Sequence, residues 1–143
     1  MNYVSPEVVV GDRILFYYSG WRKEHGAPEN EAAIGLATLP LDRFVSMEPR
    51  KDSGSLTTKP FKFEGDQLLV NVEARGGALR IEVLDDDGKT ISGYDAASCE
   101  PITADALRAE VQWRGQLLKG LSGRLIRLRF HLTRAKLFSF QVN

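Results

Sequence analysis

Three aromatic side chains are the residues of this sequence best suited to bind a ligand, because a flat ring fits the apolar face of a pyranose sugar. Trp21 and Tyr94 fall in stretches that are typical of loops, where binding residues concentrate. Trp113 alternates with Val111, which favours a position in the core. Trp21 and Tyr94 are therefore the carbohydrate-binding candidates, although a packing role is the favoured interpretation for each.

The acidic run and the histidines are weaker evidence for a binding site than the aromatic residues. The run Asp85–Gly88 is acidic enough for a calcium loop, but it lacks the alternating spacing and the distal Glu of an EF-hand. We expect an acidic turn in which the glycine takes a positive φ. His131 is expected on a solvated strand face with Arg127 and Arg129, and the only other histidine, His25, cannot be assigned. We expect no metal and no cofactor.

Nucleophilic catalysis finds no support. No serine stands in a Gly-x-Ser-x-Gly elbow, and Cys99 has no histidine near it in the sequence. Cys99 is therefore expected to be a small buried residue. The 19 acidic residues make chance carboxylate pairs inevitable, so no catalytic pair is nominated.

The composition is that of a globular chain of 143 residues, with 43% hydrophobic and 27% charged residues. A formal net charge of zero argues against nucleic acid or an anionic membrane as the main partner. The single cysteine excludes an intrachain disulfide. The start shows no basic region followed by an apolar one, so a cytoplasmic location is the default expectation.

Alternation of apolar and polar residues predicts strands throughout. Residues 68–84 alternate on both sides of Arg75-Gly76-Gly77, which predicts a β-hairpin with one buried face. The stretch 124–132 alternates in the same way, whereas residues 93–107 look irregular, with a helical turn at 104–107. No window keeps a helical period, and turn signals every 8–12 residues favour a sandwich or a jelly roll.

Two segments follow from this pattern. Residues 1–47 predict four strands, at 8–10, 13–19, 32–38 and 43–47, and the charged stretch 48–54 is the boundary candidate. Residues 54–143 are expected to form the main domain. The fold class is therefore all-β: an antiparallel β-sandwich, jelly-roll-like, with extra N-terminal strands.

Several motifs resemble one enzyme family. The segments 14–20 (Ile-Leu-Phe-Tyr-Tyr-Ser-Gly), 34–38 (Ile-Gly-Leu-Ala-Thr) and 41–46 (Leu-Asp-Arg-Phe-Val-Ser) resemble the last blade of the five-bladed β-propellers of glycoside hydrolase families 32 and 43 and their uncharacterised relatives. The segments 54–61, 69–74 and 111–113 resemble the β-sandwich that follows such propellers. The resemblance covers nearly the whole chain.

The family's catalytic motifs (Asn-Asp-Pro-Asn, Arg-Asp-Pro and Glu-Cys) have no counterpart, and Cys99-Glu100 has the reverse order. The resemblance thus implies a non-catalytic accessory domain of a glycoside-hydrolase-like protein, structural or weakly carbohydrate-binding. The alternatives are a fragment of a glycosidase whose catalytic blades are missing, and a protein-interaction module without a sugar ligand. The apolar N-terminal strands are expected to join the sandwich or to pair with a second chain, as in a homo-oligomer.

Overall fold

The computed structural model describes residues 4–24, 26–29 and 31–143. His25 therefore lies outside the described residues. The chain divides into two compact units, Met1–Arg43 and Phe44–Asn143.

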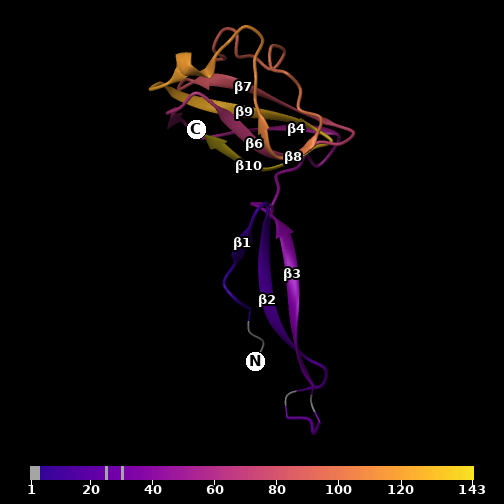
Figure 1. Cartoon of the computed structure of the whole chain (residues 1–143). Coiled ribbons are helices and arrows are strands. Elements are labelled where there is room, and N and C mark those ends of the chain that lie inside the picture. The colour runs from indigo at the N-terminus through magenta and orange to yellow at the C-terminus, as the bar shows by residue number, and fades with distance from the viewer. Residues whose placement is uncertain (1–3, 25, 30) are drawn as a thin grey trace. The chain divides into compact units, whose positions relative to one another are not determined.

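The first unit is a three-stranded antiparallel sheet in the order β1-β2-β3 (Figure 1). Its strands are β1 (Val8–Val10), β2 (Arg13–Trp21) and β3 (Ala32–Pro40). β2 and β3 pair without a bulge over nine residues, from Arg13 opposite Pro40 to Trp21 opposite Ala32. The strong β formers of these segments thus pair as the alternation predicted.

The predicted fourth strand at 43–47 is wrong. The chain leaves β3 through a turn at Asp42, which has a φ of 58°. Within residues 43–47, Met47 alone forms a β-bridge, and its partner is Leu137 of β10. The segment therefore belongs to the sandwich rather than to the N-terminal sheet.

The second unit is an antiparallel β-sandwich, which confirms the predicted fold class. One sheet has the order β10-β6-β8. In the other, β9 pairs with β7 on one side and with β4 and then β5 on the other. The elements of the unit are β4 (Ser53–Thr57), β5 (Phe61–Lys62), β6 (Leu68–Glu73), β7 (Ala78–Asp85), β8 (Asp105–Glu110), the 3₁₀ helix η1 (Leu118–Leu121), β9 (Leu125–Thr133) and β10 (Lys136–Val142).

From β5 onward, successive strands lie in opposite sheets. β6, β8 and β10 form one sheet, while β5, β7 and β9 belong to the other (Figure 1). In this unit, therefore, no strand pairs with the strand that comes directly before or after it in the sequence. The predicted hairpin over residues 68–84 is wrong for this reason, because β6 and β7 do not pair with each other.

The sequence-based prediction fails at the start of β8 and is confirmed for β9. The predicted helical turn at 104–107 is wrong, because β8 begins at Asp105 and pairs with β6. β9 alternates as predicted: Ile126, Leu128, Phe130 and Leu132 are buried between the sheets, while the residues between them are half-buried on the outer face.

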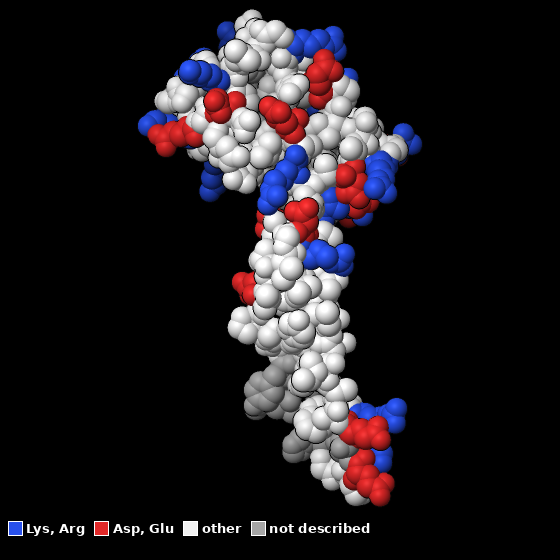
Figure 2. All heavy atoms as spheres, viewed as in Figure 1, with Lys and Arg blue, Asp and Glu red and all other residues white. Residues whose placement is uncertain are grey.

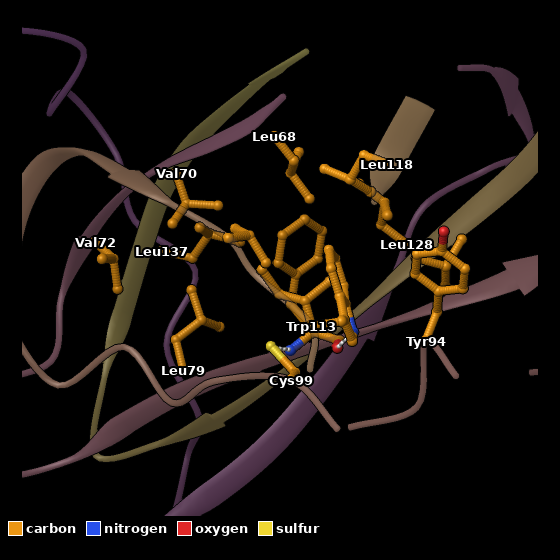
Figure 3. Close-up of a cluster of buried hydrophobic side chains, with 14 of the residues drawn as sticks. Leu68, Val70, Val72, Leu79, Tyr94, Cys99, Trp113, Leu118, Leu128 and Leu137 are labelled. Atoms are coloured by element: carbon orange, nitrogen blue, oxygen red, sulfur yellow. Dashed lines mark hydrogen bonds between the residues drawn. The ribbon is translucent and has the colours of Figure 1, made fainter. Parts of the chain in front are cut away.

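Both sheets contribute to one core (Figure 3). Val70 and Val72 from β6 are among its fully buried side chains, as are Ile81 and Val83 from β7. The rings of Phe130 and Phe140 lie 5.4 Å apart between centroids. The loops and η1 also contribute members, among them Phe63, Tyr94, Cys99, Val111, Trp113, Leu118 and Leu121.

Candidate functional site

Trp21 is the last residue of β2, rather than a loop residue, and its side chain is 51% exposed. Tyr17 and Trp21 lie on one face of the sheet because residues two and four apart in a strand point the same way. The indole ring is thus accessible in the first unit, as a stacking role requires.

Tyr94 is buried in the second unit. Only 6% of the residue is exposed, and its hydroxyl donates a hydrogen bond to the carbonyl oxygen of Leu117 at 2.8 Å. Its ring packs edge-on against Trp113, with 5.7 Å between ring centroids (Figure 3). This packing buries the ring, so the geometry supports packing, which is the role that the sequence favoured for Tyr94. Trp21 and Tyr94 also belong to different units.

Trp113 occupies the core, as its alternation with Val111 predicted. It is 4% exposed, and its indole Nε1 donates to the carbonyl oxygen of Ile81 at 3.0 Å. That bond ties the loop after β8 to β7, which is in the other sheet. Trp113 therefore fixes the position of the loop that follows it.

The acidic run Asp85–Gly88 is a turn, as predicted. Gly88 has a φ of 85°, and its N–H donates to the carbonyl oxygen of Asp85 at 3.1 Å. The Asp85 carboxylate accepts a hydrogen bond from the backbone N–H of Lys89 at 2.8 Å. These contacts close the turn, and Arg127 Nη2 of β9 also donates to the carbonyl oxygen of Asp86 at 3.1 Å.

His131 lies on the outer face of β9, as the alternation predicted. Its Nε2 is 3.2 Å from Oε1 of Glu82, which also accepts a hydrogen bond from Arg129 Nη1 at 2.8 Å. Glu82 is only 8% exposed, so these partners compensate a carboxylate that is nearly out of solvent. The group is a structural network across β7 and β9.

Cys99 is fully buried, as expected, and its Sγ accepts a hydrogen bond from the N–H of Ile81 at 3.3 Å. Burial raises the pKa of the Cys99 thiol above its ordinary value. The neutral thiol, and not the reactive thiolate, is therefore present at neutral pH.

We expect the folded chain to react with Ellman's reagent at pH 8 more than about 100-fold more slowly than the urea-unfolded chain, because the reagent must wait for local opening. Stopped-flow absorbance of the released thionitrobenzoate measures both rates. Equal rates in the two states would show that the Cys99 thiol is accessible in the fold.

The sandwich also carries a pocket that the sequence did not indicate. Its volume is about 540 Å³, within the range of roughly 300–1,000 Å³ that is typical of small-molecule sites. Buried apolar residues and exposed polar ones both line it. The apolar floor is formed by Val111, Trp113 and Leu118, and the rim carries Asp66, Glu110, Gln112, Gln116 and Leu117.

The pairing of β6 with β8 brings the two acidic residues of the pocket rim to the same end of the sheet. Glu110 ends β8 and lies opposite Leu69, and the N–H of Val111 donates to the carbonyl oxygen of Leu68 at 2.9 Å. Asp66 lies two residues before the start of β6 and lines the same pocket as Glu110 at the end of β8. Among the described residues, the carboxylates of Asp66 and Glu110 make no ion pair.

The first unit presents an exposed apolar surface. Residues that pair in a ladder share a face, so Tyr17 lies beside Leu36, and Trp21 lies beside Ala32. Ile34 is 82% exposed and Leu36 52% exposed. We define the apolar face of this sheet as Val8, Tyr17, Trp21, Ile34 and Leu36.

The strands of this sheet contain a single charged residue, Arg13. Five of the nine other charged residues of the unit lie in the loop that joins β2 and β3, where Figure 2 shows acidic and basic side chains together, and the remaining four flank the strands. A strand surface so poor in charge is typical of a protein interface rather than of a solvated sheet.

No family model, no curated protein and no solved structure matches the chain. Among the described residues there is no helix with the length and hydropathy that crossing a bilayer requires. Nor do these residues place three or more His, Cys, Asp or Glu side chains together as a metal site would need.

Proposed function

We propose that the chain is a non-catalytic accessory part of a glycoside-hydrolase-like protein. In this proposal the sandwich is a structural or weakly carbohydrate-binding module. The sheet β1–β3 is a propeller-type blade that a neighbouring blade covers. The resemblance of residues 14–20 and 34–38, in β2 and β3, to such a blade supports the assignment, and so does the sandwich that follows them.

The observation that carries the proposal is the uncovered apolar face of the sheet. A sheet with an apolar face must bury it against another layer, because an exposed patch of this kind costs solubility. Ile14 is the one hydrophobic residue of the described part of the first unit that is fully buried. A sheet of three strands with Ile34 and Leu36 in solvent is built to be covered.

Pairing between two copies of the chain is the second candidate. β3 is an edge strand of nine residues without a charge or a bulge. Charges and bulges are the usual devices that stop an edge from pairing with another chain. An unprotected edge of this length favours a homo-oligomer through the N-terminal strands.

The genomic reading frame before the codon for Met1 is the direct test of the blade assignment. We expect it to continue into four more segments of four short strands each. Such segments carrying the carboxylate motifs of the enzyme family would make the parent protein a glycosidase, which is the alternative stated above. A reading frame without strand repeats would remove the blade assignment.

The isolated chain is expected to associate through its exposed face. Its mass in multi-angle light scattering should rise with concentration, and it should enhance the fluorescence of the dye ANS. Ile34→Lys should weaken this association by at least about tenfold, because the interface would have to desolvate a charge. Light scattering over a range of concentrations measures the change.

Leu125→Lys is the matched control, since Leu125 is 49% exposed but lies at the start of β9 in the sandwich. It should leave the association unchanged. A monomer at all concentrations, with residues 1–47 rapidly cleaved by protease, would contradict pairing between two copies of the chain, whereas the reading frame before Met1 tests the covering by a neighbouring blade.

A further inference from the structure

We propose that the pocket beside Trp113 binds a neutral sugar ring. The inference deepens the accessory-domain proposal and rests on it only for the expectation that a carbohydrate is present. The site itself follows from the residues around the pocket. It assigns the weak carbohydrate binding to the end of the sandwich where β6 begins and β8 ends.

The rim has the hydrogen-bonding chemistry that neighbouring hydroxyl groups need. The carboxylates of Asp66 and Glu110 accept hydrogen bonds from O–H donors, and charged acceptors make the stronger bonds. The side-chain amides of Gln112 and Gln116 both donate and accept. The hydroxyl groups of a sugar ring are both donors and acceptors, and the carboxylates and amides of the rim together can pair with both.

The floor supplies the complementary apolar surface. Val111, Trp113 and Leu118 are buried beneath the rim, and Leu117 at the rim is 80% exposed. Apolar lining with a few convergent polar groups is the usual composition of a small-molecule site. Leu117 can cover the C–H face of a ring whose hydroxyls reach the polar rim.

Charge narrows the class of ligand. Among the described residues, no lysine or arginine lines the pocket, whereas two carboxylates do. Phosphorylated or acidic sugars would meet like charges there, which costs affinity. A neutral sugar is therefore favoured over an anionic one. A divalent cation would have two carboxylates as ligands, fewer than a protein site for calcium usually provides.

A single-tryptophan variant makes the pocket observable. The chain has two tryptophans, so Trp21→Phe leaves Trp113 as the only indole, at the floor of the pocket. We would titrate this variant of the full chain with xylotriose, cellotriose and maltotriose. The readouts are Trp113 fluorescence and the side-chain amide signals of Gln112 and Gln116 in ¹H–¹⁵N spectra. At least one trisaccharide is expected to shift both in a saturable way.

Conservative changes at the rim test the assignment without disturbing the floor. Asp66→Asn and Glu110→Gln keep the side-chain size and remove one charge each. Either change should weaken binding of that trisaccharide by roughly fivefold to tenfold, because a charged acceptor becomes neutral. Asp87→Asn, in the turn after β7, is the matched control and should leave the affinity unchanged. Circular dichroism verifies that each variant is folded.

Three outcomes would overturn the inference. In the first, no trisaccharide shifts the signals of the folded variant. In the second, a trisaccharide binds the native chain but not the Trp21→Phe variant, which would place binding at Trp21. In the third, calcium alone shifts the amides of Gln112 and Gln116 and the sugars do not. The reading frame and the self-association test the accessory-domain proposal separately, so either proposal can fail alone.

Discussion

Trp113→Ala is expected to lower the free energy of unfolding of the sandwich by about 3–5 kcal/mol, as truncation of a buried Trp typically does. The ring is 4% exposed and packs against Tyr94. Its removal leaves a cavity and also leaves the carbonyl oxygen of Ile81 without its donor. Domains of this size are stable by only about 5–15 kcal/mol, so the variant should lose a large part of its stability.

Urea denaturation followed by far-ultraviolet circular dichroism measures the loss, because this signal does not depend on the tryptophan itself. Trp113→Phe separates the two contributions, since it keeps most of the packing but loses the hydrogen bond to Ile81. Its cost should be smaller than that of Trp113→Ala. Trp21→Ala is the matched control and should leave the sandwich transition within about 0.5 kcal/mol. Equal effects of Trp21→Ala and Trp113→Ala would contradict the core position of Trp113.

The sequence predicted the buried faces of the strands better than their partners. A period of two reports which side chains of a strand are buried, but it is the same for a hairpin and for two strands on opposite sheets. Val72 and Ile81 were correctly expected in the core, yet β6 pairs with β8 and β10 while β7 pairs with β9. The partners depend on contacts that lie far away in the sequence.

β8 is a strand that the sequence did not predict at all. Its sequence, Asp-Ala-Leu-Arg-Ala-Glu, contains no β-branched or aromatic residue and is richer in helix-forming ones. Pairing with β6 overrides this local preference. A propensity argument cannot detect such a strand, because the stabilisation comes from the neighbouring strand.

The candidate pocket could not be predicted for a related reason. Asp66 and Glu110 line one pocket because of the register between β6 and β8, and no motif spans the two positions. Tyr94 lies in a loop, as expected, but the hydrogen bond from its hydroxyl to Leu117 holds the ring in the core. A loop position shows where the backbone runs, but it does not show whether a side chain points into the core.

Gly77→Ala is expected to cost about 3 kcal/mol of stability, the upper part of the usual range for overpacking. Gly77 connects β6 to β7, and Ala78 immediately after it pairs with Thr133. A Cβ at position 77 would overlap with the backbone oxygens of Thr133 and Arg134, in the turn between β9 and β10. Backbone atoms cannot rotate away as a side chain can, so the turn or the crossover between the sheets must shift.

Gly76→Ala is the control that separates crowding from backbone strain. Gly76 has a φ of 78°, which disfavours a side chain, but a Cβ there would meet no atom within 4 Å. Its expected cost is that of the left-handed backbone alone, about 1–2 kcal/mol. Urea denaturation of the two variants should therefore place Gly77→Ala below Gly76→Ala in stability. The reverse order would contradict the close approach at Gly77, because it would make the left-handed backbone at Gly76 the larger constraint.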